Sequence, residues 1–233
     1  MQGIFYGVGV GPGDPELITL KAVNILKTVD VIAIPESAEG KESLAYEIAK
    51  EYLKDGIKIM QLTFPMIRDV AERENMRKEN SLKIEKEVKD GKKVAFLTLG
   101  DPMLYSTYTY LLENLKGKIE INTIPGIMSF SAIAAKENIP LVQGEEILTI
   151  VPVNKTVDIK SKLQSNENIV FLKVSSDNKR VAEEIKNSGL ENNFVMVSQC
   201  GFKEEVSSKQ ISDIEKEKQN YFTTIIVKKR GLI

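Results

Sequence analysis

The sequence contains no histidine and only one cysteine, Cys200, among its 233 residues. Histidine is the side chain that titrates nearest to neutral pH and the commonest metal ligand, so its absence excludes Ser-His-Asp and Cys-His nucleophilic sites. One cysteine without histidine cannot build a structural zinc site. A single cysteine also excludes an intrachain disulfide, which agrees with a reducing compartment. Any chemistry must therefore use carboxylates, lysine, tyrosine, hydroxyls, main-chain groups or a bound cofactor.

Neither sign of charge is in excess, because 32 lysine and arginine residues face 33 aspartate and glutamate residues, for a net charge of −1. A nucleic-acid-binding domain normally shows a basic excess, so this balance argues against such a partner. The longest apolar runs, such as residues 29–34, are too short and too polar to span a bilayer. The N-terminus shows no signal-peptide pattern. We therefore expect a cytoplasmic protein without a nucleic-acid or membrane partner.

Strand and helix patterns alternate along the chain and predict two α/β domains, residues 1–125 and 126–233, separated where Pro125-Gly126 interrupts the pattern. In the first domain we expect strands over 4–10, 31–35, 57–63, 94–99 and 119–124, and helices over 19–27, 43–52, 69–89 and 107–115. In the second we expect helices over 129–136, 159–163 and 178–187, and strands over 147–153, 169–174, 194–198 and 222–227. In the first domain, apolar strands separated by helices indicate a parallel sheet covered on both faces. The charged segment 209–218 is expected to be a solvated surface.

Gly7, Gly9, Gly11 and Gly13 alternate through the end of the first expected strand. Glycine permits positive φ and lets a ligand approach the backbone, although a tight turn without a ligand would need the same residues. The dinucleotide fingerprint G-x-G-x-x-G fails, because its sixth position is Pro12 counted from Gly7 and Asp14 counted from Gly9. Glu36, at the end of the second strand, stands near the place of a ribose-binding acid. A nicotinamide-dependent oxidoreductase therefore remains an alternative.

Two longer motifs carry more information than the glycines alone. The strand over 94–99 runs into Gly100-Asp101-Pro102, at the carboxyl end where open α/β sheets bind ligands. The first loop continues from Pro12 to Ala22, with Pro15 and the potential cap Thr19 suited to the start of a helix. The resulting pattern, G-x-G-P-G-D-P-x-L-x-T-x-K-A, resembles the opening motif of the tetrapyrrole methylases. The resemblance extends over essentially the whole chain.

This resemblance implies that S-adenosylmethionine is bound in the cleft between two α/β domains, largely by main-chain groups. The positions that match the cofactor-binding positions of the family are Pro12, Gly100, Asp101, Leu104, Met128, Ser129, Leu172, Lys173, Cys200, Thr223 and Thr224. Three of them have alternative explanations, and the one for Cys200 is that it is simply a small buried apolar residue. Asp101 could simply shape its turn through hydrogen bonds to nearby amides. Lys173 departs from the apolar residue expected there, and could instead face the substrate.

The residues at 64–66, 96–108 and 123–131 resemble the members of the family that methylate C20 of precorrin-2 or of its cobalt complex, in cobalamin biosynthesis. Cobalt would then arrive inside the substrate, and no protein-bound metal is expected. The resemblance also implies a homodimer. The alternatives are a related methylase acting at another ring position, the oxidoreductase named above, and a protein that binds a tetrapyrrole without catalysis.

In the implied reaction, the electron-rich carbon C20 attacks the activated methyl group and then loses a proton. The protein would mainly hold the two carbons in a dry site at reacting distance, where orientation can supply roughly 7–11 kcal/mol of the barrier. The sequence identifies no secure general base, and Asp101, Tyr105 and Glu36 are candidates by residue type and place. Because the substrate carries eight carboxylates, we expect basic side chains around it, with Arg68 as the first candidate.

Overall fold

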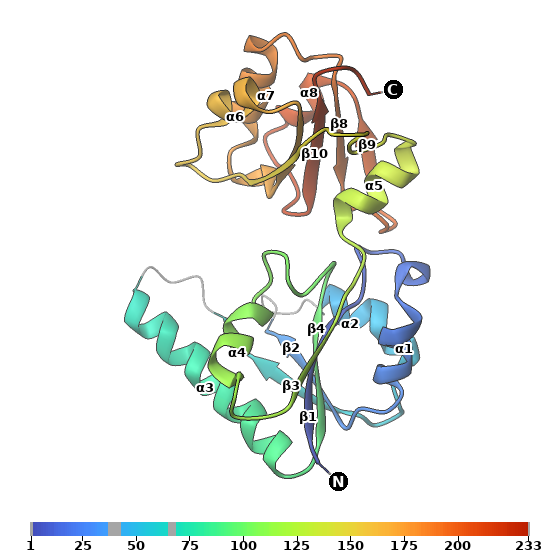
Figure 1. Cartoon of the computed structure of the whole chain (residues 1–233), viewed down its shortest axis with the longest axis vertical. Coiled ribbons are helices and arrows are strands. Elements are labelled where there is room, and N and C mark those ends of the chain that lie inside the picture. Colours follow the sequence, from blue (N-terminus) through green and yellow to red (C-terminus); the bar gives the residue numbers. More distant parts are fainter. Residues whose placement is uncertain (1, 37–42, 65–68, 233) are drawn as a thin grey trace. The chain divides into compact units, whose positions relative to one another are not determined.

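The computed structural model describes residues 2–36, 43–64 and 69–232, which form two units, each built on its own five-stranded sheet (Figure 1). The first unit is Met1–Met128 and the second is Ser129–Ile233. Both units combine a sheet with helices, so the predicted α/β class is confirmed. Within the described ranges, no helix has the length and apolar character needed to cross a membrane.

The first unit contains a wholly parallel sheet, as the sequence predicts. Its strands are β1 (Ile4–Gly9), β2 (Val31–Pro35), β3 (Lys58–Leu62), β4 (Lys93–Thr98) and β5 (Ile121–Ile124), in the order β3-β2-β4-β1-β5. The helices are α1 (Leu20–Leu26), α2 (Leu44–Ala49), α3 (Val70–Lys89) and α4 (Tyr108–Leu115), and Figure 1 shows α3 and α4 on one side of the sheet and α1 and α2 on the other. Because every strand pair is parallel, all five carboxyl ends lie at one edge of this sheet.

Buried aromatic side chains pack the central strands of the first sheet against α4. The Tyr108 ring lies 5.7 Å from that of Phe5 and 6.4 Å from that of Phe96, centroid to centroid. None of the three is exposed to solvent. Tyr108 also hydrogen-bonds through its hydroxyl to Thr123 Oγ1, at 2.6 Å. The start of α4, and hence the loop that precedes it, is therefore anchored in the core.

The start of α1 confirms the predicted cap and corrects the role expected for Pro15. Thr19 Oγ1 accepts a hydrogen bond from the Ala22 amide at 3.2 Å, so Thr19 caps α1 as predicted. Pro15 does not begin this helix. It begins a separate 3₁₀ turn, Pro15–Leu17, because Asp14 caps that turn and the backbone of Ile18 and Thr19 is extended before α1 starts.

The second unit has a mixed sheet. Its strands are β6 (Leu148–Pro152), β7 (Asn168–Leu172), β8 (Phe194–Ser198), β9 (Val206–Ser208) and β10 (Thr223–Lys228), in the order β6-β7-β10-β8-β9. Only β6 and β7 pair in parallel, whereas β10 runs antiparallel to both β7 and β8, and β9 antiparallel to β8. The helices are α5 (Ser129–Glu137), α6 (Ile159–Ser165), α7 (Asn178–Asn187) and α8 (Ile211–Ile214). The start of β10 therefore lies between the carboxyl ends of β7 and β8.

Two short elements of this unit, β9 and α8, are absent from the sequence prediction. Most of residues 209–218 is exposed, as expected of a solvated surface, but Ile214 of α8 is fully buried. Asn178 Nδ2 donates to the Ile214 carbonyl at 2.6 Å, which fastens α8 to the start of α7. A four-residue helix is too short to show a helical period in its sequence.

Candidate functional site

The loops that follow β1 and β4 are joined through two glycines. The Gly100 amide donates to the Gly11 carbonyl at 2.7 Å, and the Gly11 amide donates to the Gly100 carbonyl at 3.4 Å. Both glycines have positive φ, +85° for Gly11 and +71° for Gly100, a conformation that other residues rarely adopt. This bridge places Pro12, which is buried, directly beside the Gly100 loop.

The loop after β5 also comes close to the loops after β1 and β4, at Gly126. A Cβ at Gly9 would lie 2.6 Å from the Gly100 oxygen and 2.6 Å from the Gly126 nitrogen. A Cβ at Gly126 would lie 2.1 Å from the Gly100 oxygen. Only glycine fits at Gly9 and Gly126, since real Cβ contacts are not this short. The ends of β1, β4 and β5 thus bring their main-chain groups together at one point, which we call the three-loop junction (Gly9, Gly11, Gly100, Asp101 and Gly126).

Asp101 joins two of these loops with its carboxylate. Oδ1 accepts a hydrogen bond from the Met103 amide at 2.8 Å, and Oδ2 accepts one from the Gly126 amide at 3.0 Å. The side chain is only 8% exposed. Asp101 therefore shapes its own turn, as the alternative explanation for this residue expected, and in addition fixes the loop that leads to Met128 and Ser129.

The loop between β4 and α4 exposes apolar and aromatic side chains at this junction. Met103 is 57% exposed and Tyr105 is 49% exposed, while Leu104 is half-buried. Tyr105 has a φ of +50°, which is uncommon for a residue with a side chain. Thr98 Oγ1 and Ser106 Oγ lie 3.1 Å apart and close the base of the loop. A strained, exposed aromatic residue on an anchored loop is typical of a binding surface.

All described candidates for a general base lie at this one edge of the first sheet. Glu36 follows β2, which neighbours β4, and its Oε2 accepts a hydrogen bond from Thr63 Oγ1 at 2.6 Å. Asp101 and Tyr105 follow β4 itself. Glu36 is exposed, whereas Asp101 is buried. The candidate substrate contact Arg68 lies outside the described residues.

The remaining sequence-predicted residues gather at one edge of the second sheet. Leu172 ends β7, and Lys173 follows it in the left-handed conformation, with φ 57° and ψ 38°. Thr223 and Thr224 begin β10 and are buried. Thr223 Oγ1 hydrogen-bonds to Ser198 Oγ at 3.2 Å, at the end of β8. This group, which we call the β7–β8 edge, is thus formed by strands whose order in the sequence does not reveal their adjacency.

Cys200 belongs to the same edge, in the loop after β8. It is 6% exposed and lies between two residues of positive φ, Gln199 at 53° and Gly201 at 83°. The Gly201 amide donates to Glu205 Oε2 at 2.7 Å, and Glu205 Oε1 lies 2.5 Å from Lys136 Nζ. Sequence reasoning missed Glu205 and Lys136, because the partners are 69 residues apart and no local pattern marks either of them.

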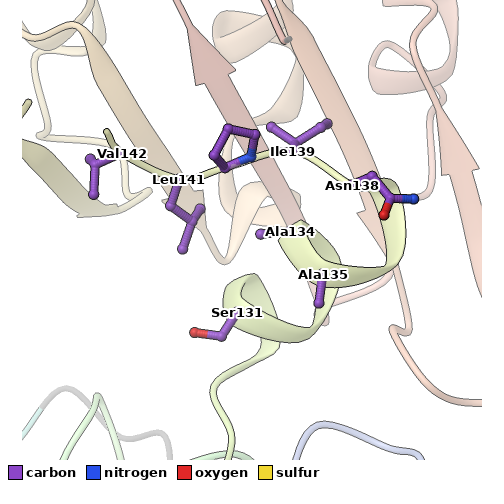
Figure 2. Close-up of a pocket in the computed structure, with 8 residues that line it drawn as sticks. Ser131, Ala134, Ala135, Asn138, Ile139, Leu141 and Val142 are labelled. Carbon is purple, nitrogen blue, oxygen red and sulfur yellow. The ribbon is translucent and has the colours of Figure 1, made fainter. Parts of the chain in front are cut away.

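A shallow apolar groove of about 420 Å³ lies elsewhere on the second unit, between α5 and the segment that follows it (Figure 2). Its lining residues are Ser131, Ala134, Ala135, Asn138, Ile139, Pro140, Leu141 and Val142. Lys228, at the far end of β10 from Thr223, donates from Nζ to the Pro140 carbonyl at 2.6 Å. This contact ties the groove to the opposite edge of the sheet, so the groove is separate from the β7–β8 edge. Among the described residues, no three acidic, cysteine or histidine side chains are grouped to hold a metal ion.

The chain matches a known family over most of its length. The family model described as Tetrapyrrole (Corrin/Porphyrin) Methylases matches residues 5–214. The chain is 44% identical, over 76% of its length and 75% of the relative, to a Methanocaldococcus jannaschii protein named "Probable cobalt-precorrin-2 C(20)-methyltransferase". It is 32% identical, over 99% of its length and 98% of the relative, to the Salmonella typhimurium cobalt-precorrin-2 C(20)-methyltransferase.

Solved structures share the fold at lower identity. A cobalt precorrin-4 methyltransferase matches with a TM-score of 0.73 and 22% identity, over 97% of this chain and 94% of that one. A uroporphyrin-III C-methyl transferase from Thermus thermophilus, complexed with S-adenyl homocysteine, matches with a TM-score of 0.69 and 19% identity, over 97% of this chain and 92% of that one. At these identities the likeness shows the fold alone.

Proposed function

Because the chain belongs to the tetrapyrrole methylase family, we propose that it methylates C20 of precorrin-2, as the cobalt complex or metal-free, in cobalamin biosynthesis. S-adenosylmethionine is the methyl donor. The observation that carries the proposal is the 32% identity to the Salmonella typhimurium C(20)-methyltransferase, which spans nearly all of both chains. The two relatives at 44% and 32% identity are both named for the cobalt form, which favours the cobalt complex as substrate. The family match also favours methyl transfer over the nicotinamide-dependent reaction.

The chemistry of the three-loop junction suits this cofactor. S-adenosylmethionine carries a positive sulfonium and no phosphate, so it needs neither a glycine-rich phosphate loop nor a basic cluster. The loop residues 10–14, 99–105 and 125–128 contain no lysine or arginine, but they offer main-chain groups and the carboxylates of Asp14 and Asp101. The glycine contacts at Gly9 and Gly126 keep these main-chain groups close together. We propose that Pro12, Gly100, Asp101, Leu104 and Met128 contact the cofactor from these loops.

The β7–β8 edge supplies the other proposed cofactor contacts. Its buried residues are small, with Cys200, Thr223 and Thr224 all less than 10% exposed. Small side chains of this kind leave room for a flat heterocycle and offer hydroxyls and main-chain groups to its polar edge. We propose that these three residues, together with Ser129, Leu172 and Lys173, contact S-adenosylmethionine.

S-adenosylmethionine supplies an already activated methyl group, so the residues of the chain need only bind, orient and remove a proton. The three-loop junction is rigid enough for orientation, because Asp101 and the glycine contacts fix three loops at once. Proton removal from C20 needs one acceptor, for which Asp101, Tyr105 and Glu36 remain the candidates. Both Asp101 oxygens accept amide hydrogens, whereas Thr63 donates to Oε2 of Glu36, which favours Glu36 over Asp101. If Glu36 or Tyr105 is the base, the variant Glu36→Gln or Tyr105→Phe should lose turnover without any change in cofactor affinity.

Anaerobic incubation with S-adenosylmethionine tests the proposal. The purified protein would receive precorrin-2 or cobalt-factor II in separate reactions, and the pigments would be analysed by mass spectrometry and NMR. We expect one added methyl group, at C20, formed faster on the cobalt-containing substrate. Methylation at another carbon would reassign the reaction within the family. No methylation of either pigment, despite cofactor binding, would reject the substrate.

The assembly and location of the protein are further parts of the proposal. We propose a cytoplasmic homodimer, as the family resemblance implies, and light scattering should then give a mass near twice the 26.0 kDa of one chain.

Arg68 is proposed to contact a substrate carboxylate. Arg68→Ala should raise the apparent KM for the pigment and leave cofactor affinity unchanged, whereas an unchanged KM would remove Arg68 from the site.

A further inference from the structure

Residues 199–201, which we call the Cys200 loop, are held in place by the carboxylate of Glu205, at the end of the same β8–β9 connection. Glu205 Oε2 accepts the Gly201 amide hydrogen at 2.7 Å, and Oε1 pairs with Lys136 Nζ at 2.5 Å. The Glu205 side chain is only 11% exposed, whereas that of Lys136 is 61% exposed. The carboxylate is therefore a largely buried link between the loop and the last turn of α5.

The loop needs such a link because its backbone is strained. Gln199, which has a side chain, adopts a φ of 53°, and Gly201 adopts 83°. Strained conformations persist only where the surroundings determine them, and they gather at ligand-binding sites. Contacts that hold this stretch include the Glu205 bond to Gly201, a bond from Asn220 Nδ2 to Gln199 Oε1 at 2.6 Å, and a bond from the Gln199 amide to the Phe222 carbonyl at 3.1 Å.

The last turn of helix α5 makes two contacts with the chain that follows Cys200. Lys136 pairs with Glu205, and Glu137 Oε1 accepts a hydrogen bond from Ser207 Oγ at 2.5 Å. The same helix begins at Ser129, another proposed cofactor contact. One rigid helix thus connects Ser129, at its first residue, with the Cys200 loop, at its end.

We propose that Lys136 and Glu205 are positioning residues that hold the Cys200 loop and α5 in the arrangement required to bind S-adenosylmethionine. The inference rests on the proposed function, because the role of Cys200 and Ser129 as cofactor contacts is part of it. Neither positioning residue needs to touch the cofactor. Their effect is exerted through the Gly201 amide and through the direction of α5.

The electrostatics of the pair agree with this role. Burial raises the pKa of the Glu205 carboxyl, but the Gly201 amide and the Lys136 ammonium outweigh it and hold that pKa below its ordinary value. The hydrogen bond to Glu205 raises the pKa of Lys136. Both groups are thus charged at neutral pH, and the charge on Glu205 strengthens its bond to the Gly201 amide.

The affinity for S-adenosylhomocysteine, measured by calorimetry, tests the proposal in the full-length protein. Glu205→Ala removes both contacts and should weaken binding about tenfold or more. Lys136→Met keeps the Gly201 bond and should have a smaller effect, and Lys136→Arg should restore affinity close to that of the wild type. The matched control is Lys186→Met, which breaks a 2.5 Å pair with Glu215 elsewhere in the same unit and should leave affinity unchanged.

A charge exchange separates positioning from simple stabilisation. The double variant Lys136→Glu, Glu205→Lys restores an ion pair, but a lysine cannot accept the Gly201 amide hydrogen. We therefore expect it to recover the urea midpoint of unfolding without recovering cofactor affinity. If Glu205→Ala does not fold, Glu205→Gln serves in its place, since it keeps an acceptor and loses the charge, and a threefold or larger loss of affinity is expected.

The outcomes distinguish this inference from the function on which it rests. A wild-type protein that fails to bind S-adenosylhomocysteine would overturn the proposed function, and this inference with it. If the wild type binds and the folded Glu205 variants bind within twofold of it, the proposed function stands and the positioning role is wrong. An equal loss in Lys186→Met would also reject the positioning role.

Discussion

The Asp101 carboxylate accepts the Gly126 amide hydrogen at 3.0 Å while its other oxygen accepts that of Met103 at 2.8 Å. Asp101 and Gly126 follow β4 and β5, which are not neighbours in the sheet, because β1 lies between them. The close approach of Gly9, at the end of β1, makes the connection possible, since a side chain there would separate the loops. Asp101 therefore fixes the geometry of the proposed cofactor loops whether or not it touches the cofactor.

Asp101→Asn should weaken cofactor binding and turnover together. Asparagine has one acceptor oxygen, so one of the two amides would face an NH₂ group and lose its hydrogen bond. A lost bond to a charged group corresponds to about a tenfold to hundredfold rise in the Kd for S-adenosylmethionine, with a similar fall in kcat/KM. Calorimetry and steady-state kinetics measure the two quantities.

Asp158→Asn is the matched control for this variant. Asp158 accepts a single amide hydrogen, from Ser161 at 2.9 Å, at the start of α6. An asparagine can keep that bond, so affinity and rate should not change. Lost turnover with unchanged cofactor affinity in Asp101→Asn would contradict the loop-shaping role and favour Asp101 as the base.

Gly126→Ala should disrupt the three-loop junction. Its Cβ would lie 2.1 Å from the Gly100 oxygen and 2.8 Å from the Gly9 Cα, both main-chain atoms that cannot move away separately. We expect a loss of about 1–3 kcal/mol in the free energy of unfolding, together with a loss of cofactor affinity. Urea unfolding and calorimetry measure the two effects.

Gly117→Ala is the control for Gly126→Ala, because it introduces backbone strain without a steric clash. Gly117 has a φ of +82° and open space around its Cβ position, so the alanine there costs about 1–2 kcal/mol in backbone strain alone. Cofactor affinity should stay at the wild-type level in this variant. A Gly126→Ala protein that binds the cofactor normally would show that the junction tolerates a wider separation than its contacts indicate.

Lys228→Met should destabilise the second unit without affecting the cofactor. Lys228 is 4% exposed, and its Nζ donates to the Pro140 carbonyl at 2.6 Å and lies 3.8 Å from Glu146 Oε2. Removing the donor deprives the Pro140 carbonyl of this hydrogen bond and Glu146 of a nearby buried cation, for a loss of about 1–3 kcal/mol in the free energy of unfolding.

Lys229→Met is the comparison for Lys228→Met. Lys229 Nζ donates to the Gln164 carbonyl at 2.8 Å in an exposed position, where water can replace it, so the expected change is within about 0.5 kcal/mol. Equal effects in the two variants would show that burial of Lys228 does not determine its contribution. A fall in cofactor affinity in Lys228→Met would show that the groove edge and the β7–β8 edge are coupled.

Stability should decrease in acid partly through Glu205. Its folded pKa lies below the ordinary value of 4.5, because the Gly201 amide and Lys136 outweigh the effect of burial. The contribution of this group is therefore present above pH 4.5 and is lost as the pH falls from there through the folded pKa. Urea unfolding across this range should show a steeper loss in the wild type than in Glu205→Gln. Parallel curves would contradict the assigned shift.

Much of the first unit could be predicted because its signals are local. The apolar strand 94–99 and the long charged helix predicted before it correspond to β4 and α3, and the Thr19 cap appears where its spacing predicts it. The β9 strand and α8 could not be predicted, because elements of three and four residues show no period. The role of Pro15 could not be predicted for a related reason, since proline favours any helical first turn and does not specify which one.

The sequence by itself determined the family, the α/β class and the residue types available for chemistry, because each of these is carried by composition or by motifs of contiguous residues. Only the tertiary structure decided that Asp101 bonds to Gly126, that Thr223 lies beside the end of β8, and that Glu205 links Gly201 to Lys136. The partners in these contacts are separated by 25 to 69 residues in the sequence, with the exception of Gly201 and Glu205, which are close in sequence. Strand order and direction bring them together, and both depend on which apolar faces pack best in the whole fold rather than on any local pattern.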